Sequence, residues 1–215
     1  MKNYEAVLFD LDGTLLDTLA DLTEAVNAVL SKFHYPKKTA LQVRRVLGNG
    51  LEQTLRLSLP PHVTKTQFQE MFLYFRKYYI AHCNVATKPY DGIPELLEGL
   101  QRRGIKMAIV SNKTQPAVKE LARLYFPDTI STAIGESPLV KRKPAPDTVL
   151  AALKELNVDP QEAVYVGDSE VDKETADRAG LDCILVSWGF RDREDLAALN
   201  PAFLVDRPEE IAKLV

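Results

Sequence analysis

The residues best suited to chemistry are aspartates that directly follow apolar segments. Asp10 and Asp12 follow the run from Tyr4 to Phe9, Asp168 follows a second apolar run, and Asp172 lies four positions later. Carboxylates that meet in one place repel one another, and a bound cation relieves that repulsion. Oxygen donors without Cys or His favour a hard cation, and Mg²⁺ suits a site that combines few carboxylates with a phosphate.

Other polar residues could complement such a cation by holding a tetrahedral oxyanion. Ser111 would supply a hydroxyl, Lys143 a second positive charge, and Gly13 and Thr14 backbone N–H groups beside the first aspartates. Each feature also has an ordinary structural interpretation, because Asp-Gly marks turns and Ser often caps helices. The elements that position these residues must therefore decide between the two interpretations.

The polar residues follow segments that read as buried strands. Apolar, β-prone runs occupy about 4–9, 105–110 and 163–166, and the second is expected to stop at Ser111 to Lys113. Further strands are expected at 129–135, 183–186 and 203–205, and helices at 93–103, 115–124, 147–156, 172–179 and from 208. Strands that alternate with helices predict a doubly wound, Rossmann-like α/β fold with a mainly parallel sheet. In such a sheet the carboxyl ends of the strands share one edge, so these polar residues can meet.

The segment that follows the first strand has a different pattern. From about 18 to 82 the apolar residues recur every three or four positions, with breaks at Pro36, Gly48–Gly50 and Pro60, which predicts helices and no strand. Thr18 is expected to cap the first helix, with Asp21 in its first turn. We therefore expect an α/β core domain at 1–16 and 85–215 and a small helical cap domain at 17–84.

Four ordered motifs resemble those of the haloacid dehalogenase-like hydrolase superfamily, in particular its phosphoglycolate phosphatase-like branch. The motifs are Asp10-Leu11-Asp12-Gly13-Thr14-Leu15, Ser111-Asn112, Lys143-Pro144-Ala145-Pro146 and Gly167-Asp168-Ser169-Glu170-Val171-Asp172. The run Ser187-Trp188-Gly189 supports that branch. One departure is Tyr90-Asp91-Gly92, where relatives often have Pro before Gly.

The resemblance implies a role for each motif residue. Asp10 would be the nucleophile that forms an aspartyl-phosphate, and Asp12 the general acid and then the general base. Ser111 and Lys143 would bind phosphate oxygens, as would Gly13, Thr14 and Asn112. The Asp10 carboxylate, the Asp12 carbonyl and Asp168 would hold Mg²⁺, with Asp172 as a direct or water-mediated ligand.

The expected function is that of a Mg²⁺-dependent phosphomonoester hydrolase acting on a small anionic metabolite such as 2-phosphoglycolate. Asn49 lies in a flexible break of the cap, and Lys113 follows the second motif, so both are candidate substrate contacts together with Arg44 and Arg45. The alternatives are an inorganic pyrophosphatase, a sugar phosphomutase similar to β-phosphoglucomutase, and a catalytically inactive binding protein on the same scaffold. A dehalogenase is disfavoured because that branch lacks an acid at the position of Asp12.

Composition narrows the class of partner. There are 27 basic and 30 acidic side chains, giving a formal net charge of −3, and no basic tract that would favour nucleic acid. No apolar stretch is long enough to span a membrane, and no signal peptide is evident. Cys83 and Cys183 are expected to be free thiols in a reducing cytoplasm. We expect a cytoplasmic monomer or homodimer with a small phosphorylated metabolite as its partner.

Overall fold

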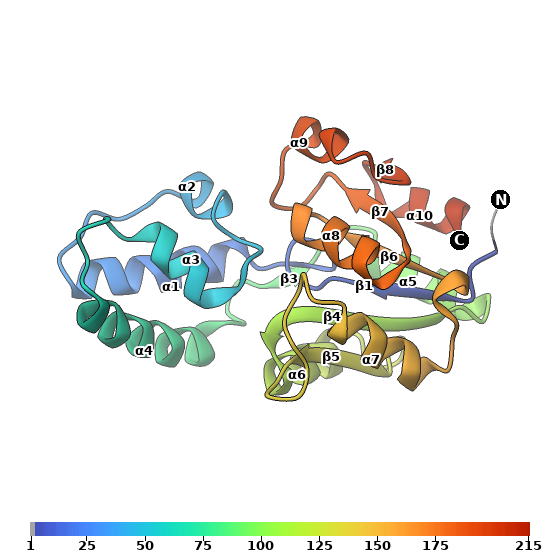
Figure 1. Ribbon diagram of the computed structural model, residues 1–215, viewed down its shortest axis with the longest axis horizontal. Helices are drawn as coiled ribbons and strands as arrows, with labels where there is room; N and C mark the ends of the chain where they lie inside the picture. The colour runs from blue at the N-terminus through green and yellow to red at the C-terminus, as the bar shows by residue number, and fades with distance from the viewer. Residues whose placement is uncertain (1–2) are drawn as a thin grey trace. The chain divides into compact units, whose positions relative to one another are not determined.

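The computed structural model describes residues 3–215, which form two compact units (Figure 1). An α/β unit contains the N-terminal segment up to Leu16 together with Pro89–Val215, and a helical unit contains Asp17–Lys88. The chain passes between the units in the short strands β2 (Leu16–Asp17) and β3 (Lys88–Pro89), which pair in a two-stranded sheet. The boundary on the return path is thus at 88/89, four residues beyond the position expected from the sequence.

A six-stranded parallel sheet forms the centre of the α/β unit (Figure 1). The strands lie in the order β5-β4-β1-β6-β7-β8. Their bounds are β1 Ala6–Phe9, β4 Lys106–Thr114, β5 Thr132–Glu136, β6 Ala163–Gly167, β7 Asp182–Val186 and β8 Phe203–Val205. Leu8 pairs with Ala108 on one side and Tyr165 on the other, so β1 is a central strand between β4 and β6. The predicted doubly wound α/β fold is confirmed.

Helices cover both faces of this sheet and bury two apolar clusters. The helices are α5 (Ile93–Arg102), α6 (Gln115–Tyr125), α7 (Asp147–Leu156), α8 (Glu170–Ala179), α9 (Arg193–Ala198) and α10 (Pro208–Leu214), with a 3₁₀ turn at Pro160–Glu162. Side chains of α5, α6 and α10 pack with Val7 and Phe9, while those of α7, α8 and α9 pack with Leu8 and Tyr165. Because successive residues of β1 alternate between the faces, a short apolar strand anchors both layers.

The second strand departs from the sequence prediction. β4 does not stop at Ser111 but continues to Thr114, with a shift of its register against β5 between Val110 and Thr114. A bulge of this kind redirects the side chains that follow it, and such features are frequent beside active sites. The polar residues from Ser111 to Lys113 therefore lie within an irregular part of a strand and not in a loop.

The helical unit contains the expected helices and no strand within the segment 18–82. Its helices are α1 (Leu19–Lys32), α2 (Ala40–Arg44), α3 (Gly50–Ser58) and α4 (Lys65–His82). Thr39 and Thr64 each form a capping box with the glutamine three positions later, which satisfies exposed N–H groups at the starts of α2 and α4. Apolar side chains of α1 and α4, such as Val26, Val29 and Phe75, are fully buried.

The start of α1 differs from the predicted cap. The Thr18 side chain makes no capping hydrogen bond, and Oδ1 of Asp17 instead accepts from the Leu19 N–H at 3.1 Å. The buried Asp21 carboxylate accepts hydrogen bonds from three successive backbone N–H groups, at residues 85 to 87, and from the Thr87 hydroxyl at 2.7 Å. Asp21 therefore fastens the returning segment of the helical unit to its first helix, a role that local sequence did not indicate.

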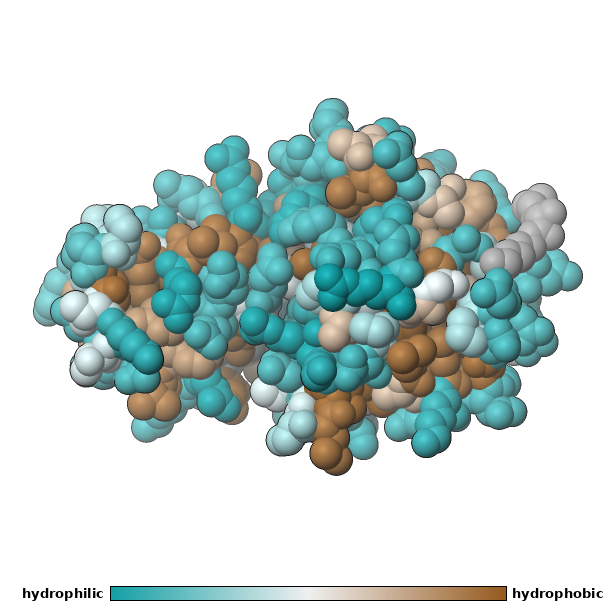
Figure 2. Space-filling view, in the orientation of Figure 1, coloured by the Kyte–Doolittle hydropathy of each residue, from teal (hydrophilic) through white to brown (hydrophobic). Residues whose placement is uncertain are grey.

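The surface and the thiols show few unusual features. The face seen in Figure 2 is largely hydrophilic with scattered apolar areas. Cys83 and Cys183 are not joined in a disulfide, as expected. Across residues 3–215, no helix is both long enough and apolar enough to cross a membrane.

Candidate active site

Three adjacent strands of the sheet deliver the principal polar side chains. Asp10 follows β1, Ser111 lies in β4 and Asp168 follows β6. β4 and β6 flank β1 on opposite sides and run parallel to it, so their carboxyl ends meet at one edge. The chain order also reverses at β1, and open α/β sheets bind ligands at the edge where this reversal occurs.

Lys143 links two of the aspartates. Its Nζ atom lies 2.7 Å from Oδ1 of Asp10, 2.7 Å from Oδ1 of Asp172 and 2.9 Å from the Tyr165 hydroxyl. The Lys143 side chain is 3% exposed, and those of Asp10 and Asp172 are 9% and 1% exposed. Burial alone would lower the pKa of Lys143, but the two carboxylates raise it above its ordinary value. The ammonium group therefore stays charged at this edge.

Asn112 holds the backbone of Lys143, and Asp172 holds its ammonium group. The Asn112 side chain accepts from the Lys143 N–H at 2.7 Å and donates to its carbonyl at 3.2 Å, which holds the loop before α7 against β4. Oδ2 of Asp172 accepts from the Ser169 hydroxyl at 2.6 Å and from the Asp168 N–H at 3.2 Å. One oxygen of Asp172 is therefore held by groups at the start of α8, while the other contacts Lys143.

Asp168 is held by the segment after β7. Its Oδ2 accepts from the Phe190 N–H at 2.6 Å, and its Oδ1 is 3.4 Å from the Thr14 hydroxyl. The Trp188 indole N–H donates to the Thr14 carbonyl at 3.0 Å, so the same segment also secures the turn after β1. One loop therefore positions both a candidate metal ligand and a candidate phosphate-binding turn.

Three glycines leave the space that the carboxylates occupy. A Cβ at Gly13 or Gly189 would overlap with Asp168, and a Cβ at Gly167 would overlap with Asp172. Gly13 additionally has φ +90°, a conformation that L side chains rarely adopt. Glycine at these positions allows the backbone to approach the acidic cluster closely.

The donor set fits a hard cation. One oxygen each from Asp10, Asp168 and Asp172 lie within 4.8 Å of one another, and all three residues are buried. Burial and the neighbouring Asp172 and Asp10 carboxylates raise the pKa of Asp168 well above its ordinary value. Lys143 therefore does not compensate all of the buried negative charge. An oxygen-only cluster with charge left to neutralise suits a divalent metal ion.

Asp12 lies outside this cluster and has a different partner. Its Oδ1 atom is 2.6 Å from Nζ of Lys113, and the two side chains are 20% and 6% exposed. The Lys113 N–H donates to the Ser111 hydroxyl at 3.2 Å. In the structure Lys113 therefore forms an ion pair with a candidate acid, whereas the sequence had suggested only that it contacts the substrate.

The α/β unit brings together nearly all the residues selected from the sequence. These are Asp10, Asp12, Gly13, Thr14, Ser111, Asn112, Lys113, Lys143, Asp168 and Asp172. Asn49 is the N-cap residue of α3 in the helical unit, where its side chain makes no capping hydrogen bond. Tyr165 and the Phe190 N–H were not selected, and the only local signal was a tyrosine within an otherwise apolar strand.

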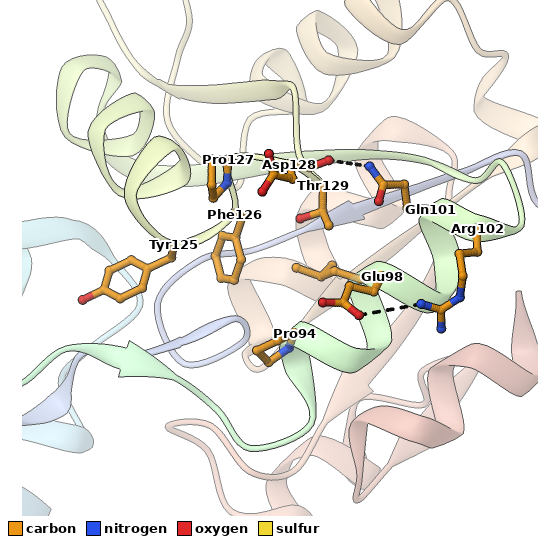
Figure 3. Close-up of a pocket in the computed structure, with 10 residues that line it drawn as sticks. Pro94, Glu98, Gln101, Arg102, Tyr125, Phe126, Pro127, Asp128 and Thr129 are labelled. Atoms are coloured by element: carbon orange, nitrogen blue, oxygen red, sulfur yellow. Dashed lines mark hydrogen bonds and ion pairs between the residues drawn. The ribbon is translucent and has the colours of Figure 1, made fainter.

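A separate surface pocket contains none of these residues. It lies between α5 and the end of α6, with Pro94, Tyr125 and Phe126 among its lining side chains (Figure 3). Glu98 and Arg102 form an ion pair at 3.6 Å along its α5 side. The catalytic candidates therefore belong to the sheet edge and not to this pocket.

Comparison with known proteins decides the family. The model of haloacid dehalogenase-like hydrolases matches residues 7–186, a span that includes all the candidate catalytic and metal-binding side chains described above. The chain belongs to the haloacid dehalogenase-like hydrolases. The predicted superfamily is therefore confirmed.

Individual relatives of this hydrolase can be aligned with it over most of their length. A phosphoglycolate phosphatase of Aquifex aeolicus is 34% identical over 97% of this chain and 95% of its own. An N-acetylmuramic acid 6-phosphate phosphatase of Pseudomonas aeruginosa is 30% identical over 96% of this chain and 92% of its own. A crystal structure of a protein from Lactobacillus delbrueckii subsp. bulgaricus has 34% identity and a TM-score of 0.94, covering 100% and 98% of the two chains. The chain is thus a phosphatase of the phosphoglycolate phosphatase branch, and the names of these relatives indicate that they act on small phosphorylated substrates.

Proposed function

We propose that this phosphatase is Mg²⁺-dependent, forms an aspartyl-phosphate on Asp10 and acts on small anionic phosphate esters such as 2-phosphoglycolate. The observation that carries this proposal is the contact between Lys143 and Asp10, within a cluster of buried carboxylates. A charged lysine beside the nucleophile can neutralise a phosphoryl group as it arrives. Hydrogen bonds to Asn112 and Tyr165 orient Lys143 toward this carboxylate.

The first half-reaction transfers the phosphoryl group to the protein. A carboxylate oxygen of Asp10 forms a bond to phosphorus while the bond from phosphorus to the leaving oxygen breaks. Asp12 gives its proton to that oxygen, so the leaving group departs as a neutral alcohol while the phosphoryl group stays on Asp10. Lys143, the Ser111 hydroxyl and the Thr14 N–H group contact the phosphoryl oxygens. The Gly13 N–H group, expected from the sequence to join them, donates instead to the Leu16 carbonyl at 2.9 Å, so Gly13 serves the turn and not the phosphate.

The second half-reaction returns the nucleophile. Asp12, now a carboxylate, takes a proton from a water molecule that attacks phosphorus, and the bond to Asp10 breaks with release of inorganic phosphate. The same carboxylate serves as acid and then as base because its protonation state alternates between the two halves. Asp12 lies two residues from Asp10, which places one titratable group beside both reacting oxygens.

Asp10, Asp168 and the Asp12 carbonyl would hold Mg²⁺. When bound, the ion screens the negative charges of the nucleophile and the phosphate from each other. Asp172 already contacts Lys143, Tyr165 and Ser169, which favours a supporting or water-mediated role for this residue. The oxygen-only donor set favours Mg²⁺ over metals that prefer nitrogen or sulfur.

We further propose that the helical unit selects the substrate. The sequence predicted this unit as a cap at 17–84, and the structure has it as a compact unit over Asp17–Lys88. The two short connections through β2 and β3 suit a hinge that lets a lid exclude water. Arg44, Arg45 and Asn49 belong to this unit and are candidate contacts for a carboxylate on the leaving group.

A phosphate-release screen tests the proposal. The purified protein is assayed with 2-phosphoglycolate, N-acetylmuramic acid 6-phosphate, neutral sugar phosphates and pyrophosphate, after chelation and after return of Mg²⁺ or Ca²⁺. We expect kcat/KM for 2-phosphoglycolate to exceed that for neutral sugar phosphates by at least about tenfold, the effect of one well-placed charged contact. Activity should require Mg²⁺, with Ca²⁺ a poor substitute because its coordination is looser.

Different outcomes would replace different parts of the proposal. Preference for pyrophosphate, or turnover of a sugar phosphate without phosphate release, would favour the pyrophosphatase or mutase alternative. Full activity after exhaustive chelation would contradict the metal site. Preference for N-acetylmuramic acid 6-phosphate would keep the chemistry and change only the substrate.

A further inference from the structure

The candidate acid, Asp12, forms an ion pair with Lys113. The ammonium group of Lys113 lies 2.6 Å from Oδ1 of Asp12, and its side chain is 6% exposed. We propose that Lys113 is a positioning residue that orients the Asp12 carboxylate for proton transfer to the leaving group. This inference rests on the proposed function, because it assumes that Asp12 is the general acid and base.

The backbone of Lys113 is fixed on two sides. Its N–H donates to the Ser111 hydroxyl at 3.2 Å, within the irregular end of β4. A Cβ at Gly135 in β5 would lie 2.7 Å from the Lys113 carbonyl oxygen, so the neighbouring strand packs closely against it. A lysine held in this way offers its ammonium group from a defined direction, as a positioning group must.

Lys143 and Lys113 neutralise different carboxylates of the site, which indicates different roles for the two lysines. Lys143 contacts Asp10 and Asp172, whereas Lys113 contacts Asp12, whose carboxylate is not part of the compact acidic cluster. A charge-assisted hydrogen bond restricts the rotation of a carboxylate more strongly than a neutral one. Lys113 therefore holds the Asp12 carboxylate in one orientation, separate from the carboxylates proposed to bind the metal.

The orientation determines which oxygen handles the proton. Because Lys113 engages Oδ1 of Asp12, we assign proton transfer to Oδ2. As the bond between phosphorus and the leaving oxygen breaks, the proton passes from Oδ2 to that oxygen. In the second half-reaction Oδ2 receives a proton from the attacking water, so the residue ends as it began. A misplacement of about 1 Å in such a group costs on the order of a hundredfold in rate.

Leaving-group dependence tests this role. The parameter kcat/KM reports only the first half-reaction, in which p-nitrophenolate departs with little help from an acid, whereas an alkoxide must be protonated. We therefore expect Lys113→Met to lower kcat/KM for alkyl phosphates about 10- to 100-fold more than for p-nitrophenyl phosphate. Lys113→Arg, which retains the charge, should recover part of that loss. Both variants are checked for wild-type circular dichroism and metal affinity.

A double-mutant comparison separates positioning from other roles. If Lys113 acts through Asp12, Lys113→Met should reduce kcat/KM for alkyl phosphates less than about twofold further in an Asp12→Asn background. Equal losses on alkyl and aryl esters, or an additive loss in the double variant, would overturn the inference. So would a loss confined to KM for carboxylate-bearing esters, since that result would make Lys113 a substrate contact. If the variant is too unstable to assay, the same comparison is made with Lys113→Gln.

The same assays distinguish failure of this inference from failure of the proposed function. A wild-type protein that hydrolyses no phosphate ester with Mg²⁺ would overturn the function and, with it, the role of Lys113. An active wild type whose Asp12→Asn variant shows the leaving-group effect while Lys113→Met does not would overturn the inference alone.

Discussion

The Nζ atom of Lys143 lies 2.7 Å from Oδ1 of Asp10, and both side chains are almost completely buried. The two residues are separated by 133 positions in sequence, yet the sheet brings them into direct contact. Asp172 and Tyr165 contact the same ammonium group and fix its position. The proposed nucleophile, Asp10, is therefore already paired with a cation of the protein itself.

Removal of this cation should be far more harmful than removal of its neutral partner. We expect Lys143→Met to lower kcat/KM by about 10²- to 10³-fold, as is typical for a charge that stabilises a transition state. Tyr165→Phe is the matched control, because it deletes a hydroxyl 2.9 Å from the same ammonium group and leaves both ion pairs in place. Tyr165→Phe should lower kcat/KM less than about tenfold. Steady-state kinetics on one substrate that give equal losses would contradict this ranking.

Gly189 should be intolerant of even a small side chain. A Cβ there would overlap with Asp168 and with the carbonyl oxygen of Gly13. Gly189→Ala is expected to lower the unfolding free energy by about 1–3 kcal/mol, the usual cost of overpacking, and to weaken metal binding. Gly99→Ala in α5 is the control, since its nearest contact would be 3.8 Å away and alanine favours helices. Urea unfolding and metal titration of both variants measure the contrast.

Asp21 is expected to be important for the stability of the helical unit. Its buried carboxylate accepts hydrogen bonds from the N–H groups of Val85, Ala86 and Thr87. Asp21→Asn would place an amide N–H₂ group where an acceptor is needed, and we expect a loss of about 2–3 kcal/mol. Asp195→Asn, at an exposed position in α9, should change stability by less than about 0.5 kcal/mol. Unchanged thermal unfolding of Asp21→Asn would contradict this account.

Alkaline stability should depend on Tyr4. Burial and the hydrogen bond to Asp182 raise the pKa of Tyr4 from 10 to about 12. A group with a raised folded-state pKa stabilises the protein below its unfolded pKa, and this contribution is lost as pH rises through the folded value. The stability advantage of wild type over Tyr4→Phe should therefore shrink as the pH rises from 10 to 12.

The comparison with Tyr4→Phe isolates this group because the other tyrosines titrate in both proteins. Urea unfolding at a series of pH values provides the two stability curves. Parallel curves across this range would show that Tyr4 titrates in the folded state as it does in the unfolded chain.

Much of the fold and of the site was predictable from local sequence. Apolar runs followed by Asp10 or Asp168 identify the carboxyl ends of parallel strands, and these ends necessarily share one edge. The alternation of strands and helices gave the architecture for the same reason. The shared edge also predicted that Lys143 lies near Asp10 and Asp172, but its direct ion pairs with both carboxylates were not predicted.

Features that depend on tertiary packing were not predictable in the same way. The length of β4 beyond Ser111 depends on its register against β5. The contact between Lys113 and Asp12 depends on rotamers set by that irregular strand, and Asp21 binds a segment more than 60 positions away. Tyr165 joins the site because its hydroxyl reaches Lys143 across the sheet. No periodicity or spacing encodes such contacts.

Trapping of the phosphoenzyme tests the central claim most directly. Wild type and the variants Asp10→Asn and Asp12→Asn are mixed with substrate and Mg²⁺, quenched in acid and analysed by intact and peptide mass spectrometry. We expect one acid-quenched phosphoryl group on Asp10 in wild type, and its accumulation in Asp12→Asn if the second half-reaction is slowed by about 10²- to 10⁴-fold. Asp10→Asn should retain its fold and show neither phosphoenzyme nor turnover. Normal turnover by Asp10→Asn, or a phosphoryl group on another residue, would contradict the account.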